Sequence, residues 1–295
     1  MSWRTVVISK RSKLDYKMNY LIVREGLVEQ RVFIKEIAVL IIESTAVALT
    51  SYVLCELVKQ NTLVIFCDHD KTPLANLYTS YGTRDTCSKI LDQVAWKDYK
   101  KDKIWTKIIK NKINNQKNVL KMCDADTNTI NLMEMHRLEV VEGDKSNREA
   151  VAARLYFKTL FGMDFNRDAD CFYNAMLNYG YSLILSSISR EISANGYLTQ
   201  IGIKHCKATN PYNLSCDLIE PFRPIVDYFV KKYEGELSFN KDAKRYLLKI
   251  FESDFIVDGK VHKITSAIHY YILSVVKYLN TNDDIDAVLE INYEL

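Results

Sequence analysis

One short segment, residues 202–224 (GIKHCKATNPYNLSCDLIEPFRP), combines a histidine with two carboxylates, His205, Asp217 and Glu220. Three of the four prolines in the chain lie in the same segment. Prolines restrict the backbone, so they keep His205 and Glu220 at a fixed separation with little conformational entropy left to lose. The segment therefore has the residue types and the stiffness to hold groups that do chemistry.

Glu149 adds a third carboxylate, in the stretch SNREAVAARLYFKTLFG at residues 146–162. A glutamate, a histidine and a second glutamate offer oxygen and imidazole ligands, a mix that suits Mn²⁺ or Mg²⁺ better than structural zinc. Residues from three segments of a helical bundle can converge on one cation. Glu149, His205 and Glu220 are therefore candidates for a divalent metal site.

The same carboxylates also have a structural explanation. Ser146 is a good N-cap, and Glu149 three residues later would complete a capping box. Asp217 could likewise cap a helix whose box Glu220 closes, with Pro221 suited to the first turn. If instead Asp217 and Glu220 share one helix face, the two charges repel unless a cation or a proton separates them. The local sequence leaves both explanations open.

Around these residues the sequence predicts an α+β fold, with a small β-rich domain over residues 1–82 and a larger all-α catalytic domain over residues 83–295. Apolar and alternating runs predict strands at residues 3–9, at 37–42, at 62–66 and from Pro73, and a hairpin over residues 19–34 that turns at Gly26. Helical spacing predicts a helix over residues 45–61, with Thr45 as its N-cap. The stretch 83–142 has no glycine or proline, which permits long helices, and further helices follow from residue 147.

Composition sets broad limits on the protein class. The 295 residues are 48% hydrophobic and 26% charged, as in globular proteins of one large or two ordinary domains. None of the seven cysteines forms a C-x-x-C pair, which argues against a disulfide framework or a zinc ribbon. The longest apolar run, at residues 37–42, is far too short to span a membrane, and the basic start of the chain does not resemble a signal peptide. We therefore expect a cytoplasmic protein.

The net charge of +3 permits a nucleic-acid partner without requiring one. Its distribution is more informative, because residues 97–121 contain nine lysines and only two acids, while residues 283–295 are acidic. Lys103, Lys107 and Lys110 recur at helical spacing, so one stripe of a helix could follow phosphates. A solvated helix face is the alternative.

Several motifs together resemble the CRISPR-associated integrase family of spacer acquisition, and most of all its type II branch. They are residues 63–82 (LVIFCDHDKTPLANLYTSYG), the SNREAVAARLYFKTLFG stretch, residues 174–184 (NAMLNYGYSLI) and the segment from residue 202 onward. Single motifs such as N-R-E are weak. Their order and spacing over nearly the whole chain, in a β-then-α layout, are specific.

The resemblance implies a metal-dependent DNA integrase that joins 3′-hydroxyl ends of short foreign DNA to the CRISPR repeat by transesterification, with nuclease activity on branched DNA. It implies that Glu149, His205 and Glu220 bind Mg²⁺ or Mn²⁺, although many family members carry aspartate in place of Glu220. Asp217 would support the ligands or handle protons. The implied partners are double-stranded DNA, a second copy of the chain that dimerises through the N-terminal domain, a small CRISPR-associated partner dimer and other type II CRISPR proteins.

Basic residues are expected to hold the DNA backbone, and the candidates are Arg84, Lys107, Lys110 and Lys112, with Arg148, Arg154, Lys204 and Arg223 near the metal. Arg223 could equally clamp a helix end. Two other functions remain open from the sequence. One is a plain metal-dependent nuclease, in which water replaces the 3′-hydroxyl. The other is a non-catalytic DNA-binding scaffold whose carboxylates only cap helices.

Overall fold

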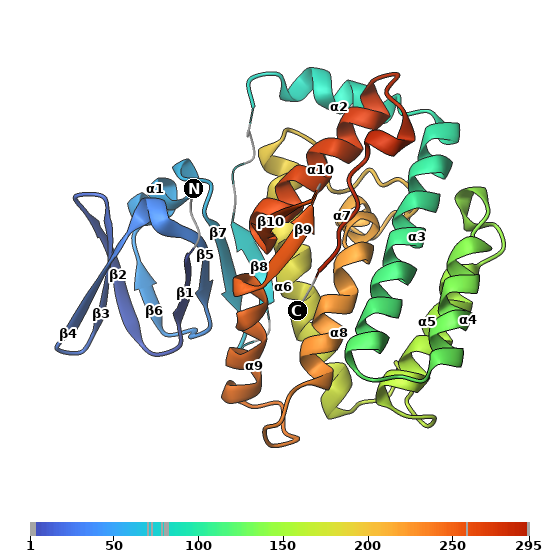
Figure 1. Ribbon diagram of the computed structural model, residues 1–295. Coiled ribbons are helices and arrows are strands. Elements are labelled where there is room, and N and C mark those ends of the chain that lie inside the picture. Colours follow the sequence, from blue (N-terminus) through green and yellow to red (C-terminus); the bar gives the residue numbers. More distant parts are fainter. Residues whose placement is uncertain are drawn as a thin grey trace. The chain divides into compact units, whose positions relative to one another are not determined.

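The computed structural model describes residues 4–69, 71, 73–77, 79, 83–257 and 259–293 (Figure 1). Two compact units divide the chain. The first comprises Met1–Thr86 with Ser189–Tyr197, and the second comprises Cys87–Ile188 with Leu198–Leu295. Gly82, where the expected domain boundary falls, is outside the described residues. In the described part of the chain, no helix has the length and apolar character needed to cross a membrane.

The first unit contains two four-stranded sheets. One sheet holds, in spatial order, β1 (Arg4–Ile8), β5 (Ile37–Ile42), β7 (Leu63–Cys67) and β8 (Pro73–Leu77), the first three parallel and β8 antiparallel. The other holds β4 (Val28–Phe33), β3 (Tyr20–Glu25), β2 (Ser12–Lys17) and β6 (Val47–Leu49). These strands confirm the predicted β-rich beginning of the chain. The predicted hairpin is β3 and β4, and Gly26 adopts the positive φ of 60° that its turn needs.

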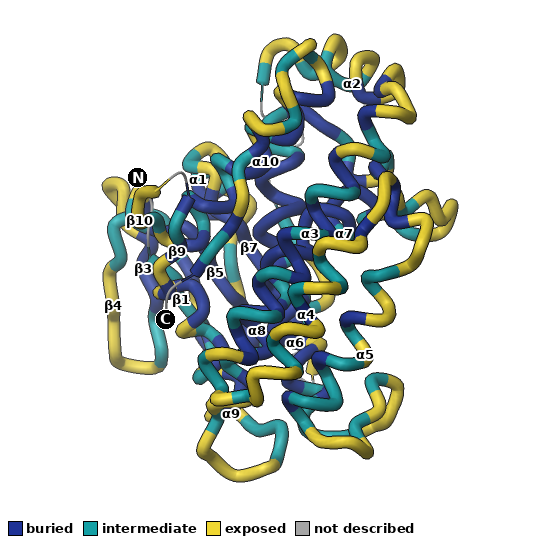
Figure 2. Tube along the Cα trace, turned by 45° about the vertical axis from the view of Figure 1, so that its right-hand side comes forward, coloured by how far each residue is buried: buried dark blue, intermediate teal, exposed yellow. Residues whose placement is uncertain are grey.

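Both sheets contribute to one hydrophobic core. Leu14 and Leu21 from one sheet, Leu40 and Val64 from the other, and Leu57 from a helix belong to the same buried cluster. All six residues of β5 are buried, which explains why this strand reads as an unbroken apolar run rather than an alternating one. Figure 2 shows β5 and β7 in the dark blue of buried residues, whereas β4 is mostly exposed.

The helix predicted over residues 45–61 is wrong in its first part. Val47–Leu49 form β6, which pairs in parallel with Ser12–Leu14, and helix α1 spans only Ser51–Lys59. Its N-cap is Thr50, whose Oγ1 accepts a hydrogen bond from the N–H of Val53 at 3.3 Å. Pairing with β2 therefore overrides the helical spacing of the residues before Thr50.

The second unit is built on α3 (Asp98–Met122), the longest described helix. The other helices are α2 (Thr86–Val94), α4 (Thr127–Leu138), α5 (Arg148–Phe161), α6 (Phe172–Ala194), α7 (Asn213–Leu218), α8 (Arg223–Lys231), α9 (Lys241–Leu247) and α10 (Ile264–Asn280), with the short 3-10 helices η2 (Glu142–Asp144), η3 (Glu220–Phe222) and η4 (Leu248–Glu252). The end of α6, from Ser189, belongs to the first unit. α3 contacts α4, α5, α8, η2 and η3. A single helix thus touches the elements that carry Glu149 and Glu220.

One small sheet interrupts the helices of the second unit. β9 (Asp254–Val257) and β10 (Lys260–Lys263) form an antiparallel hairpin that the sequence analysis did not predict. Gly259 has a φ of 69° in the turn between them, a conformation that favours glycine. The predicted β-then-α layout is otherwise confirmed.

Candidate active site

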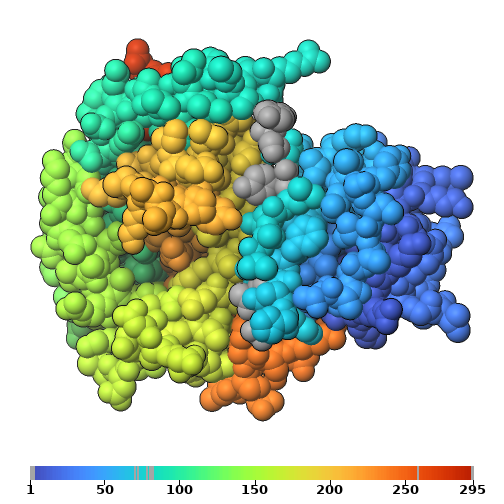
Figure 3. Space-filling view, turned by 180° about the vertical axis from the view of Figure 1, so that it is seen from behind, coloured from blue at the N-terminus to red at the C-terminus, as the bar shows by residue number. Residues whose placement is uncertain are grey.

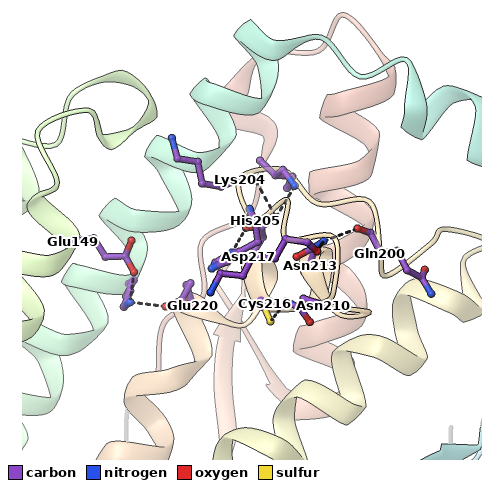
Figure 4. A network of polar contacts seen from close by, with 12 residues as sticks. Glu149, Gln200, Lys204, His205, Asn210, Asn213, Cys216, Asp217 and Glu220 are labelled. Atoms are coloured by element: carbon purple, nitrogen blue, oxygen red, sulfur yellow. Dashed lines mark hydrogen bonds and ion pairs between the residues drawn. The ribbon is translucent and has the colours of Figure 1, made fainter. Parts of the chain in front are cut away.

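Two carboxylates converge on one buried ammonium (Figure 4). Lys112 on α3 places its Nζ 2.6 Å from Oε1 of Glu149, at the start of α5, and 2.5 Å from Oε2 of Glu220, at the start of η3. The side chains of Lys112 and Glu220 are 9% and 6% exposed, whereas that of Glu149 is 27% exposed. Three segments far apart in the sequence thus meet around a single positive charge.

Glu220 is ionised in this environment. Burial alone would raise its pKa, but the charges of Arg223 and Lys112 hold the pKa of Glu220 well below its usual range. Its Oε1 accepts a hydrogen bond from Nε of Arg223 at 2.8 Å. Its Oε2 is buried and lies 2.5 Å from the Nζ of Lys112. Each oxygen of Glu220 therefore faces a different cation.

His205 is oriented by Asp217. The Asp217 side chain is fully buried in α7, and its carboxylate accepts hydrogen bonds from the backbone N–H groups of Ile203, Lys204 and His205 at 2.5–3.0 Å. Its Oδ1 is also 2.7 Å from Nδ1 of His205. This contact uses one ring nitrogen and leaves Nε2 as the nitrogen that can bind another group, an arrangement typical of histidines that bind metals.

The charges around His205 link it to the two glutamates. The hydrogen bond with Asp217 raises the pKa of His205, burial opposes this, and the charges of Asp217, Glu220 and Glu149 raise it further. All three carboxylates therefore act on the same ring. The indole of Trp105 on α3 also meets this ring edge to face, at 6.0 Å between centroids.

Gly202 allows the loop to close tightly around Asp217. A Cβ at this position would lie 2.3 Å from the carbonyl oxygen of His205 and 2.8 Å from Oδ2 of Asp217. Any larger side chain would push the loop off the carboxylate. Beside this loop is a cavity of about 600 Å³, lined by Gln200–Gly202, His205–Pro211, Asn213 and Lys101. Figure 3 shows this face of the molecule with a hollow beside the residues drawn in gold. The side chain of His205 is 38% exposed, so it lies at an accessible surface.

The capping-box explanation for Glu149 is wrong. The N-cap of α5 is Asn147, in a left-handed conformation with a φ of 53°, and its side chain makes no capping hydrogen bond. Asp144 satisfies the helix start instead, accepting from the N–H groups of Arg148 and Glu149 at 2.8 and 3.1 Å. The Glu149 side chain is thereby left to pair with Lys112.

The cap explanation is also wrong for Asp217 and Glu220. Asp217 lies within α7 rather than before it, and its carboxylate faces the loop that carries His205. Glu220 faces Lys112 and Arg223, so the two carboxylates have different partners and do not form the converging pair considered from their spacing. Pro221 does fall in the first turn of a short helix, as predicted.

The candidate ligands are of the types that bind divalent cations, but they do not form a closed cluster. Among the described residues, no three Asp, Glu, His or Cys side chains lie close enough together to hold a metal ion, and Lys112 lies between the two glutamates. The buried Oε2 of Glu220, the half-buried carboxylate of Glu149 and Nε2 of His205 are nevertheless the oxygen and imidazole donors that Mn²⁺ or Mg²⁺ accepts. The position between Glu149 and Glu220 already stabilises one positive charge, the ammonium of Lys112.

The expected contact between Lys112 and the DNA backbone is wrong. It is buried and paired with two carboxylates, so it does not offer its charge to a phosphate at the surface. Arg223 clamps Glu220 and stacks over the ring of Tyr181 at 4.7 Å, which agrees with the alternative of a structural clamp. The other candidates retain at least part of their surface, namely Arg84, Lys107, Lys110, Arg148, Arg154 and Lys204.

The lysine stripe faces away from the carboxylates. At 3.6 residues per turn, Lys112 lies about half a turn around α3 from Lys103, Lys107 and Lys110. These three lysines line a separate cavity of about 590 Å³, together with Asp286 and Glu290 from the acidic end of the chain. Lys107 also donates a hydrogen bond to the carbonyl oxygen of Ile285 at 3.1 Å. The stripe and the carboxylate site therefore occupy opposite faces of one helix.

The positioning roles of three residues on α3 were missed from the sequence, although Lys112 was named there as a DNA contact. Besides Lys112 and Trp105, Asn115 donates from Nδ2 to the carbonyl oxygens of Pro221 and Ile291 at 2.9 and 2.7 Å, which fixes η3 against the helix. The available signal was the spacing of seven residues between Trp105 and Lys112, which places both on one helix face. It did not reveal which elements pack against that face.

A buried network extends from Glu220 into the core. Arg223 stacks over the Tyr181 ring, and the Tyr181 hydroxyl donates a hydrogen bond to Asp227. Burial raises the pKa of Asp227 to about 6, although the hydrogen bond from Tyr181 lowers it in part. Because the pKa in the unfolded chain is about 4, the folded state holds this proton more tightly than the unfolded state.

We expect the Asp227 carboxyl to destabilise the fold as the pH rises from about 4 to about 6, because the folded protein must then ionise a buried acid. Relative to Asp227→Asn, the wild-type free energy of unfolding should fall by up to about 3 kcal/mol over this window. Urea unfolding of both proteins at several pH values between 4 and 7 measures the difference. A constant difference across the series would contradict the raised pKa.

Comparison with known proteins defines the class. Residues 5–250 match the family model described as CRISPR associated protein Cas1. The CRISPR-associated endonuclease Cas1 of Neisseria meningitidis serogroup C is 31% identical over 281 residues, which cover 93% of this chain and 91% of that protein. A Cas1 endonuclease of Saccharolobus solfataricus is 26% identical and covers 78% of this chain and 75% of its own.

Solved structures agree with the fold. A casposase bound to integration product superposes with a TM-score of 0.75 at 20% identity, covering 96% of this chain and 92% of that one. The Cas1 protein TM1797 of Thermotoga maritima superposes with a TM-score of 0.73 at 16% identity, covering 94% and 97%. The fold and the sequence match place the chain among CRISPR-associated DNA endonucleases. It belongs to the Cas1 family, and its similarity to the Neisseria protein is consistent with the type II resemblance.

Proposed function

We propose that this protein is the integrase of CRISPR adaptation, a metal-dependent enzyme that joins the 3′-hydroxyl ends of short DNA to the CRISPR repeat. The observation that supports this most directly is the convergence of Glu149 and Glu220 on one buried cation position, beside a histidine whose ring a buried aspartate orients. A helix-capping role for these carboxylates, on which the scaffold alternative depended, does not account for their partners.

Glu149, Glu220 and Nε2 of His205 would hold Mg²⁺ or Mn²⁺, and Asp217 would fix the ring of His205. When bound, the ion would polarise the scissile phosphate or lower the pKa of the attacking hydroxyl. The protein's own part is mainly to position the reacting groups and to neutralise charge. Lys204 and Arg154, exposed cations on the loop of His205 and on α5, would contact DNA phosphates.

The partners follow from the same class of reaction. Related folds are seen in a casposase bound to integration product, in a TtCas1–DNA complex and in a Cas6-RT-Cas1–Cas2 complex. We propose double-stranded DNA as the substrate, both as prespacer and as repeat, a dimer that assembles through residues 1–82, and a small CRISPR-associated partner dimer. The setting would be the cytoplasm of a cell with a type II system and its other CRISPR proteins.

The experiment that tests this function uses a labelled short duplex, a supercoiled plasmid that carries a repeat, the small partner protein, and Mg²⁺ or Mn²⁺. Metal-dependent transfer of the label to the plasmid is the expected result. Nicked plasmid without joined label would identify a hydrolytic nuclease instead, since water would then have replaced the 3′-hydroxyl. DNA binding without either product would identify a scaffold.

The lysine stripe gives a separate prediction about DNA affinity. If Lys107 and Lys110 each neutralise a phosphate, Lys107→Gln/Lys110→Gln should reduce the slope of log affinity against log salt by about two. Binding of a fluorescent duplex at several NaCl concentrations measures the slope. The matched control is Lys10→Gln/Lys13→Gln, which removes two exposed charges from the first unit. An unchanged slope would exclude the stripe from the DNA interface.

A further inference from the structure

Lys112 is the one described residue whose charge touches both candidate glutamate ligands. Its side chain rises from the middle of α3, where the backbone has no freedom to move away, and only 9% of it is exposed. An ammonium removed from water to this extent is costly unless charged partners surround it. The two glutamates supply those partners, so the three groups form one mutually dependent unit.

The same geometry shows what would happen without the lysine. Glu149 and Glu220 would face each other across a partly dry space, and two like charges in that position repel strongly. The carboxylates would separate or take up a proton, and the ion pairs that link α5 and η3 to Lys112 on α3 would be lost. The ammonium therefore maintains the spacing of the two carboxylates in the metal-free protein.

We propose that Lys112 is a built-in counter-cation, which holds Glu149 and Glu220 in place when no metal is bound and gives up that position to the divalent ion. This inference rests on the proposed function, because it takes the two glutamates as ligands. Lys112 is thus a positioning residue that competes with the metal. Replacing the ammonium by Na⁺ or K⁺ leaves the positive charge between the two carboxylates unchanged. Replacing it by Mg²⁺ or Mn²⁺ raises that charge by one, so the exchange favours divalent ions.

The test compares wild type with Lys112→Met by Mn²⁺ calorimetry and by thermal unfolding, without DNA. The variant should lose about 5–10 °C of melting temperature in the absence of metal, because the buried Glu220 keeps only Arg223 as a counter-ion and Glu149 loses its ion pair with Lys112. It should bind Mn²⁺ about tenfold or more tightly than wild type, because the competing charge is gone. Saturating Mn²⁺ should therefore raise its melting temperature by more than it raises that of wild type.

Lys100 provides a matched control on the same helix. It is 8% exposed, but its ammonium donates to the backbone carbonyl oxygens of Tyr278 and Thr281 rather than to carboxylates. Lys100→Met should also lower the melting temperature, and yet it should leave Mn²⁺ affinity and the Mn²⁺-induced rise equal to those of wild type. This comparison separates competition with metal from the general cost of removing a buried lysine.

Lys112→Arg covers the case in which Lys112→Met does not fold without metal. The guanidinium keeps the charge and can bind two carboxylates at once, so Mn²⁺ affinity should fall about tenfold or more. Equal Mn²⁺ affinity in wild type, Lys112→Met and Lys112→Arg would overturn the inference. If wild type itself binds no Mn²⁺ that Glu149→Gln abolishes, the proposed metal site fails first, and the two failures are therefore distinguishable.

Discussion

Glu149→Gln is expected to lower the rate of DNA joining by about a thousandfold, the effect of losing several kcal/mol of transition-state stabilisation from a bound metal. The amide has almost the shape of the carboxylate but carries no charge to hold a divalent ion. The variant should lose some stability through the Lys112 ion pair but should still fold, because Lys112 keeps Glu220 as a partner and the start of α5 is capped by Asp144 rather than by Glu149. Strand-transfer rates at saturating DNA measure the effect.

Glu134→Gln is a suitable control for the loss of a glutamate charge. Glu134 on α4 is 34% exposed and pairs with Lys117 and Arg137, two residues that do not belong to the carboxylate site. Joining by this variant should match wild type within about twofold. If Glu149→Gln joins DNA as fast as Glu134→Gln does, Glu149 is not a metal ligand.

Asp217→Asn is expected to impair both the fold and the reaction. The carboxylate accepts from three backbone N–H groups and contacts the His205 ring, and an amide must direct its own N–H groups at some of these donors. We expect a loss of about 3 kcal/mol or more in the free energy of unfolding, since the site is fully buried and the hydrogen bonds are to a charged group. Urea unfolding measures this part of the effect.

The catalytic part of the Asp217 effect acts through His205. Residues that orient a metal ligand typically change metal affinity or activity by about 10–100-fold when replaced, and we expect a decrease of that size in both joining and Mn²⁺ affinity. Asp126→Asn is the control, because Asp126 only caps α4 through the N–H and hydroxyl of Thr129. A variant Asp217→Asn that is destabilised but has normal Mn²⁺ affinity would reduce Asp217 to a structural residue.

The sequence predicted the elements whose residue pattern is compatible with only one type of secondary structure. A run without glycine or proline gave the long helix α3, and an unbroken apolar run gave the buried strand β5. In residues 45–61 the apolar positions before Thr50 are compatible both with a helix and with a short edge strand. Only the pairing of Val47–Leu49 with β2, which depends on tertiary contacts, decides between them.

The candidate site shows the same limit. The resemblance singled out Glu149, His205, Asp217 and Glu220, whereas the types and spacing of these residues fit metal ligands and helix caps equally well. Lys112 looked like one more cation in a basic run, because nothing in its neighbours shows that its side of α3 meets α5 and η3. The partner of a charged residue on a long helix is set by packing between distant segments, which a single sequence does not encode locally.

The most direct test of the central claim is strand transfer by His205→Ala beside His262→Ala. His262 lies on β10 and stacks against Tyr270 at 4.9 Å between centroids, with no part in the carboxylate site. We predict metal-dependent joined product for wild type and His262→Ala, and none for His205→Ala, with DNA binding retained by all three. Equal joining by His205→Ala and wild type would show that the reaction takes place elsewhere in the protein.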